Sequence, residues 1–387
     1  MLRDAVDRVG TDCSKWDGMV EKFGREDILP LWVADSDIAI STTIQEAVIE
    51  RAKHPIYAYT LYSDSFYQSI IDWYEREFEW SIDRESIAGE HGVVVSINLA
   101  IKAFTNEGDG ILVQTPIYPP FISSCTRNGR VVLENRLIFE NGQTTIDWDD
   151  FESKARDAKL FLLCSPHNPS TRAWSREELV HMAEICQRHE VIVVADEIHS
   201  DLVFFGSHIP FGSIDSAIDN TVTLHAPSKT FNIAGLNSSY VIVPNQDLRE
   251  QYQAEHERAG LDNGNPFGIT ALQSAYNDES GWLEEFRAHI VSNAEYIREY
   301  ITTHIPEIVP YKHDATFLMW LDCSGLGLDD EALSSFFIDS AKLGLNSGIS
   351  FGEAGSGFMR LNLATSLEML QEAMSRLSSA MEILRNR

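Results

Sequence analysis

The chain has 387 residues, 44% of them hydrophobic, and a formal net charge of −29. This length exceeds what one small core needs, so two domains are the natural expectation. The large negative charge argues against nucleic acid and anionic membranes as partners. No apolar run is long enough to span a bilayer, and the N-terminus lacks an apolar signal region, so we expect a cytoplasmic protein.

The cysteines indicate neither a disulfide framework nor a metal site. There are five, an odd number, and they are scattered at positions 13, 125, 164, 186 and 323. No Cys-x-x-Cys pair and no Cys/His cluster at metal-ligand spacing occurs among them. We therefore expect small core residues in a reducing compartment, and no bound metal.

The first eighty residues predict an irregular start and then two helices. Asp35 and Asp37 precede the first helix, at 44–53, and are candidates to cap it. Pro55 cannot continue that helix. The second helix, at 65–79, has apolar residues at three- and four-residue spacing.

From residue 92 onward, strand patterns alternate with helical patterns. Apolar runs predict strands at 92–95, 110–114, 130–133, 160–164, 191–195, 221–224 and 240–243. Helical patterns lie between several of them, for example at 176–189. Such alternation predicts an α/β domain with a largely parallel sheet and helices on both faces. Ligands in such sheets bind at the carboxyl ends of the strands.

The pattern changes after residue 275. A long helix at 282–302 precedes a strand at 316–321, a helix at 330–343 and a glycine-rich segment at 348–362. This order is typical of a smaller α+β domain.

Polar side chains follow several of the expected strands. Asp196 ends one of these strands, and a buried carboxylate there needs a cation or hydrogen-bond donors. The alternative is that Asp196 is the N-cap of a helix, whose backbone amides would be the donors. Asn168 lies between prolines after another strand, and Tyr118 follows a third. The ordinary explanation for Asn168 is turn formation, and the ordinary explanation for Tyr118 is packing in the core. At 95–98 a strand feeds a helix, whose N–H groups and dipole can hold a phosphate.

Residues 228–230, Ser-Lys-Thr, follow the strand at 221–224. Their hydroxyls can bind an anion, and Lys229 can do the same or form an imine. Together with the strand-end residues above, they fit pyridoxal phosphate. This cofactor needs a lysine imine, an acid beside its ring nitrogen, an amide donor to its ring oxygen, a phosphate cradle and a stacking ring.

Seven motifs extend this pattern over nearly the whole chain. They are LPLWVAD at 29–35, YAYT at 57–60, QTPIYPPF at 114–121, PHNP at 166–169, DEIH at 196–199, PSKTFNIAG at 227–235 and GFMRLN at 357–362. With them the chain resembles fold-type I pyridoxal-phosphate enzymes of the class I and II aminotransferase family. Trp32, His167, His199 and residues 231–232 favour the MalY/PatB-type cystathionine β-lyase (C–S lyase) branch over ordinary aminotransferases.

The resemblance implies a PLP-dependent transferase-like α/β fold of the aspartate aminotransferase type. Such a fold has a large domain with a mostly parallel seven-stranded sheet, plus a smaller α+β domain. We expect an N-terminal segment at 1–45, packed on the small domain and the site entrance. The large cofactor-binding domain is expected at 46–275 and the small domain at 276–387. The resemblance also implies a homodimer whose subunits share active sites.

The resemblance further implies roles for individual residues. Lys229 carries the Schiff base and moves the α-proton, and Tyr59 of a neighbouring subunit joins it as a catalytic residue that also contacts the phosphate. Arg360 grips the substrate carboxylate, with Ala34 and Asp35 nearby. The other implied cofactor contacts are Val95, Ser96, Ile97 and Ser228 at the phosphate, Tyr118 stacked on the ring, Asn168 at the ring oxygen, Asp196 at the ring nitrogen, and His199.

We expect a β-lyase that cleaves cystathionine or a related cysteine S-conjugate to a thiol, pyruvate and ammonia. An aminotransferase shares every step up to α-proton loss, so the named residues do not separate the two. A non-catalytic regulatory protein is disfavoured because all the cofactor groups are present. Departures from the family pattern near the substrate leave the exact substrate open; they are Ser36, Ala58, Ser165 and residues 170–172.

Overall fold

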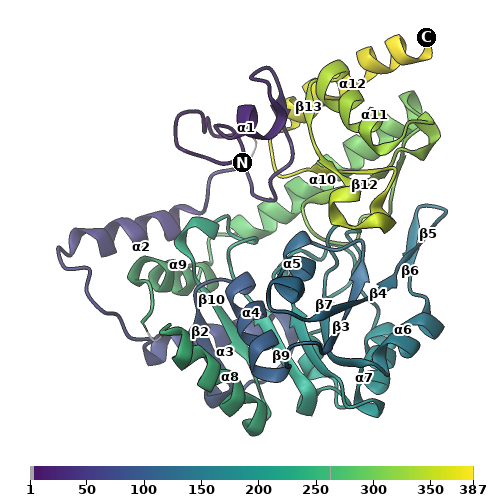
Figure 1. Ribbon diagram of the computed structural model, residues 1–387. Helices are drawn as coiled ribbons and strands as arrows, with labels where there is room; N and C mark the ends of the chain where they lie inside the picture. Colours follow the sequence, from purple (N-terminus) through teal and green to yellow (C-terminus); the bar gives the residue numbers. More distant parts are fainter. Residues whose placement is uncertain (1–3, 262, 387) are drawn as a thin grey trace.

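The computed structural model describes residues 4–261 and 263–386. Figure 1 shows a larger unit built around a sheet, a smaller unit crossed by α10 and α12, and an N-terminal segment beside the smaller unit. The helices are α1 (Met19–Phe23), α2 (Thr42–Lys53), α3 (Asp64–Phe78), α4 (Val93–Phe104), α5 (Pro119–Arg127), α6 (Trp148–Ala155), α7 (Arg176–Arg188), α8 (Gln246–Ala259), α9 (Pro266–Tyr276), α10 (Trp282–His304), α11 (Asp330–Ser335) and α12 (Leu367–Arg385).

The central sheet has seven strands in the order β2-β10-β9-β8-β7-β3-β4. They are β2 (Ile87–Glu90), β3 (Gly110–Thr115), β4 (Val131–Arg136), β7 (Ala158–Cys164), β8 (Ile192–Asp196), β9 (Thr221–His225) and β10 (Ser239–Ile242). Only β10 runs antiparallel to its neighbours. The structure thus confirms the mostly parallel, seven-stranded sheet expected from the sequence.

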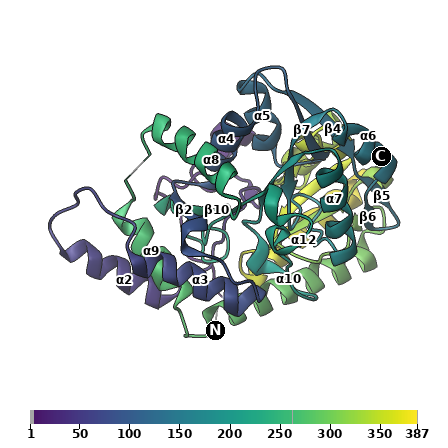
Figure 2. The same ribbon diagram turned by 90° about the horizontal axis from the view of Figure 1, so that it is seen from below.

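Both faces of this sheet are covered by helices, which explains the continuous apolar runs of its strands. Successive strand residues point to opposite faces. On β3, Ile111 packs in the core that α4, α5 and α8 cover, whereas Leu112 packs in the core that α6 and α7 cover. Figure 2 shows α2, α3 and α9 side by side at one end of the molecule.

The smaller unit contains an antiparallel sheet in the order β11-β12-β15-β14. Its strands are β11 (Val309–Pro310), β12 (Leu318–Asp322), β14 (Asn346–Ser347) and β15 (Phe358–Asn362). Apolar side chains of α10 and α12 pack with those of β12 and β15. The remaining short strands are β1 (Leu29–Pro30), which pairs with β13 (Leu343–Gly344), and the hairpin β5 (Ile138–Glu140) and β6 (Gln143–Thr145).

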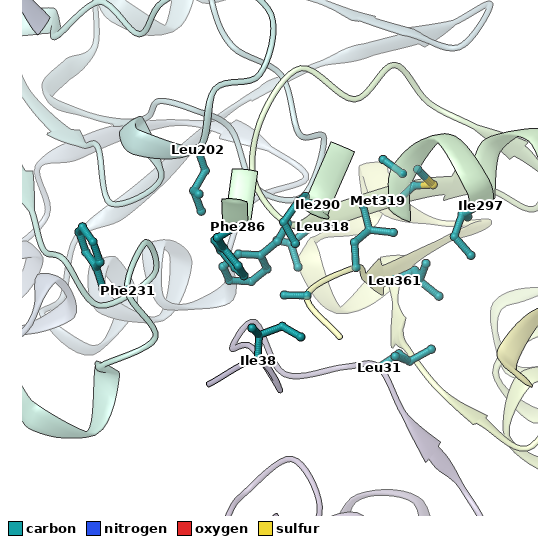
Figure 3. Close-up of a cluster of buried hydrophobic side chains, with 14 of the residues drawn as sticks. Leu31, Ile38, Leu202, Phe231, Phe286, Ile290, Ile297, Leu318, Met319 and Leu361 are labelled. Atoms are coloured by element: carbon teal, nitrogen blue, oxygen red, sulfur yellow. The ribbon is translucent and has the colours of Figure 1, made fainter. Parts of the chain in front are cut away.

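One buried cluster joins all three parts of the chain (Figure 3). It runs from Phe231 of the large unit, through Phe286 and Ile290 of α10, to Leu318 of the small sheet and Leu31 of the N-terminal segment. The proposed boundaries at 45/46 and 275/276 stay predictions, since this shared core crosses both. None of the helices in the described part of the chain combines the length and apolar character needed to cross a bilayer.

Two local expectations are wrong. The apolar run at 92–95 is the start of α4, and the strand lies earlier, at β2; a short apolar run cannot be assigned to strand or helix by periodicity alone. The caps of α2 also differ, because Ser41 Oγ accepts from the Thr43 amide. Asp35 and Asp37 instead form ion pairs with Arg8.

Candidate active site

A cavity of about 670 Å³ lies at the carboxyl ends of the central strands, between the two units. Residues that follow β3, β7, β8 and β9 form its floor, and the N-terminus of α4 forms one wall. The N-terminal segment and β15 close it from the other side. The expected site residues that line it are Ala34, Val95, Tyr118, Asn168, Asp196, His199, Ser228, Lys229 and Arg360.

Lys229 is held in this cavity by the loop that follows β9. Its Nζ donates to the Ala34 carbonyl at 2.6 Å. The next residue, Thr230, donates to the buried Asp201 carboxylate at 2.6 Å and so anchors the loop. Burial, reinforced by the positive charge of Arg360, lowers the pKa of Lys229 to about 8. An amine with this pKa is far more often unprotonated, and therefore nucleophilic, than an ordinary lysine.

Asp196 ends β8 inside the same cavity. Burial raises the pKa of Asp196 to about 7, although the Ile198 amide donates to its Oδ1 at 3.1 Å. A cation beside it would favour the ionised carboxylate. His199, three residues later, is buried, and its Nδ1 has no hydrogen-bond partner among the residues that the structure describes. Both residues therefore suit a ligand with polar groups at this position.

Arg360 reaches the cavity from β15. Its neighbours Met359 and Leu361 pack into the core on the other face of that strand. The side chain is only 4% exposed, and burial lowers the pKa of Arg360 to about 10. It donates to Asn168 Oδ1 and to the Trp32 carbonyl, both at 3.0 Å. Within the described ranges, 4–261 and 263–386, its Nε has no hydrogen-bond partner. A buried guanidinium whose partners are neutral is suited to an anion.

The N-terminus of α4 offers a phosphate cradle. Gly92 precedes it at φ 141°, a conformation that side chains rarely adopt. The first helical hydrogen bond runs from the Ser96 amide to the Gly92 carbonyl, so the amides of residues 93–95 have no partner within the helix. Residues 93–95 and Ser228 line the cavity.

Ser96 and Ile97 are not among the residues that line the cavity, and their role at the phosphate stays a prediction. The Ser96 amide and hydroxyl both donate to Gly92, and Ile97 is buried in the core beneath α4. The choice of these two residues followed from the misplaced strand, because the helix begins at Val93, three residues earlier than expected. Glycine is an accepted N-cap residue, so Gly92 before an apolar run was a signal that the helix could begin at Val93.

Two further predicted residues lie outside this cavity. Asp35 points to Arg8, which donates to both of its oxygens at 3.0 and 2.7 Å. Tyr59 is 91% exposed, in the loop between α2 and α3 at the outer edge of the molecule (Figure 1). Sequence reasoning also missed Asn346 and Phe351, which line the cavity from a segment with no motif of its own.

These residues fit pyridoxal phosphate. The set supplies a buried amine with a low pKa, a carboxylate in need of a cation, an unpartnered imidazole nitrogen and helix amides for a phosphate. Tyr118 completes it: the ring is half-buried, and burial and the Asp196 charge raise the pKa of its hydroxyl. An aromatic face at this position can stack on a planar ring.

Comparison with known proteins agrees with this chemistry. The family model for class I and II aminotransferases matches residues 33–377. Cystathionine β-lyase PatB of Bacillus subtilis is 41% identical, over 97% of this chain and 98% of the relative. Protein MalY of Escherichia coli is 32% identical over 98% of both chains. The crystal structure of cystalysin from Treponema denticola, which contains pyridoxal 5′-phosphate, has a TM-score of 0.96 at 30% identity and covers 99% of each chain.

Proposed function

The chain belongs to the class I and II aminotransferase family, and from this we propose that it is a pyridoxal-phosphate-dependent carbon–sulfur β-lyase. It cleaves cystathionine or a related cysteine S-conjugate to a thiol, pyruvate and ammonia. The observation that carries this proposal is the near full-length similarity to a relative named cystathionine β-lyase. The side chains that line the cavity also support the proposal, because they include a group suited to each part of the cofactor and one suited to the substrate carboxylate.

The bound cofactor draws electrons from the substrate Cα, which favours loss of the α-proton and then of a thiolate from Cβ. Lys229 Nζ, with its pKa near 8, can take the α-proton at neutral pH. Asp196 would lie beside the ring nitrogen, whose positive charge would favour the ionised carboxylate. Asn168 turns its Oδ1 to Arg360, so its Nδ2 remains the donor for the ring oxygen. Arg360 orients the α-carboxylate.

An aminotransferase of an amino acid is the second candidate, because the matching family model bears that name. A direct assay separates the two. The purified protein is incubated with cystathionine, and pyruvate is measured with and without an added 2-oxo acid. A lyase forms pyruvate without the oxo acid. Turnover that requires the oxo acid, with no pyruvate in its absence, would assign the protein as an aminotransferase.

We also propose that the protein acts in the cytoplasm as a homodimer. All five cysteines are free and four of them are buried, as expected in a reducing compartment. The loop between α2 and α3 exposes Ile56, Tyr57, Tyr59 and Leu61. Neighbouring exposed apolar side chains of this kind are typical of an interface. The shared-site arrangement places Tyr59 in the partner's cavity.

Subunit mixing tests this arrangement. Lys229→Ala and Tyr59→Phe homodimers are each expected to be severely impaired. In a hybrid, one site carries both changes and the other carries neither, so each hybrid dimer should have about half of the wild-type activity. Random pairing of equal amounts makes about half of the dimers hybrids, so the mixture should reach about a quarter. Activity is measured after refolding or subunit exchange. Hybrids that regain nothing, from parents that are each inactive and dimeric, would show that Tyr59 does not cross.

A further inference from the structure

The segment that carries Ala34 holds two carboxylates, and both are paired to the N-terminal residues. Arg8 Nη1 and Nη2 donate to Asp35 at 3.0 and 2.7 Å, and Nη1 also donates to Asp37 at 2.9 Å. Asp37 also accepts from Lys15 Nζ at 2.7 Å and from Trp16 Nε1 at 3.1 Å. Lys15 is fully buried. Arg8 is therefore the main partner of Asp35, with Lys15 Nζ farther off at 3.8 Å.

Asp35 lies within electrostatic reach of the reacting groups. It follows Ala34, whose carbonyl accepts from Lys229 Nζ at 2.6 Å. Its negative charge raises the pKa of Lys229, against the stronger lowering effects of burial and of Arg360. The same cavity has to admit an anionic α-carboxylate if the proposed function holds. An unpaired Asp35 would repel that carboxylate.

Arg8 Nη1 donates to the Ser36 carbonyl at 3.2 Å, but most backbone contacts of this segment come from other residues. Asn362 Nδ2 donates to the carbonyls of Val33 and Asp35 at 2.6 and 2.7 Å. Asn232 donates to the Ser36 carbonyl at 2.8 Å and accepts from the Ser36 amide at 3.1 Å. Loss of Arg8 would therefore change the charge at Asp35 more than the path of the chain.

From these contacts we propose that Arg8 is a positioning residue that neutralises Asp35, so that the cavity can bind the α-carboxylate of the substrate. The proposal rests on the proposed function only for the identity of that substrate. In this proposal the N-terminal segment affects the electrostatics of the site, in addition to packing against the rest of the protein. Asp35 thus acts on the site through its charge, in place of the direct substrate contact expected from the resemblance.

Arg8→Met tests the charge. We expect KM for the amino acid substrate to rise about tenfold with kcat changed much less, because the unpaired Asp35 repels the carboxylate before any chemistry. Without substrate, the pH midpoint of the cofactor's visible absorption band should rise by about one unit, since a nearby negative charge favours the protonated form. The double variant Arg8→Met/Asp35→Asn should restore both values toward wild type.

Arg385→Met is the matched control, because Arg385 forms a comparable two-point pair with Glu307 away from the cavity. It should leave KM and the midpoint unchanged. Asp35→Asn alone leaves Arg8 paired only with Asp37 and removes one negative charge, so it should shift the midpoint downward. This variant tests the proposal if Arg8→Met does not fold. An unshifted midpoint in Arg8→Met, or a double variant as impaired as the single one, would overturn the proposal. Absence of pyruvate in wild type would instead count against the lyase assignment, and the spectral titration would still test Arg8.

Discussion

Lys229→Ala should lower kcat by at least about 10²–10⁴-fold, the contribution typical of a positioned proton-transfer group. Its Nζ lies in the cavity and has a pKa lowered to about 8, which suits it to proton transfer near neutral pH. The variant should also lose the covalent attachment of the cofactor. Borohydride reduction of wild type should abolish the visible band and leave the cofactor on the peptide that contains Lys229.

Lys154→Ala is a suitable control for this experiment. Lys154 lies on α6, half-exposed and outside the cavity, at 3.8 Å from Asp150. The Lys154→Ala variant should keep the visible absorption band of the cofactor, the borohydride label on the peptide that contains Lys229, and the wild-type activity. A wild-type protein that binds no cofactor, or a label on a different lysine, would contradict the role given to Lys229.

The floor of the site could be predicted from the sequence because its signals are local. Asn168, Asp196 and Lys229 each follow a buried strand within a few residues, and parallel strands bring their carboxyl ends to one edge of the sheet. The order of three such residues along the chain was therefore enough to bring them together. The fold class followed from the same alternation of strand and helix.

Other parts of the site depend on contacts that no local pattern reports. Arg360 donates a hydrogen bond to Asn168, which lies 192 residues away in the sequence. Arg8 donates to Asp35, which lies 27 residues away. The carboxylates at 35 and 37 looked like helix caps because their partners lie far up the chain. The phosphate cradle was misplaced for a different reason, since three valines after Gly92 fit a strand and a helix equally well.

Arg360→Ala should keep the cofactor's visible band but lose most of its kcat/KM for amino acid substrates. Lys229 and Asp196, which we propose hold the cofactor, form no hydrogen bond with Arg360 among the described residues, so cofactor binding should survive. The expected loss is roughly 2–5 kcal/mol, the range for a buried charged contact whose partner is removed. An exposed ion pair would be worth only about 0–1 kcal/mol.

Arg136→Ala provides the matched comparison, because Arg136 forms such an exposed pair with Glu353 at 2.8 Å. Its kcat/KM should stay close to that of wild type.

The Arg360→Lys variant makes the test more specific. Lysine keeps the positive charge but lacks the planar guanidinium that binds a carboxylate at two points, so this variant should recover only part of the lost kcat/KM. Steady-state kinetics on cystathionine and absorption spectra of each variant supply both readouts. Near-normal kcat/KM in Arg360→Ala would assign the substrate carboxylate to another residue, and a lost band would show that Arg360 supports the cofactor through Asn168.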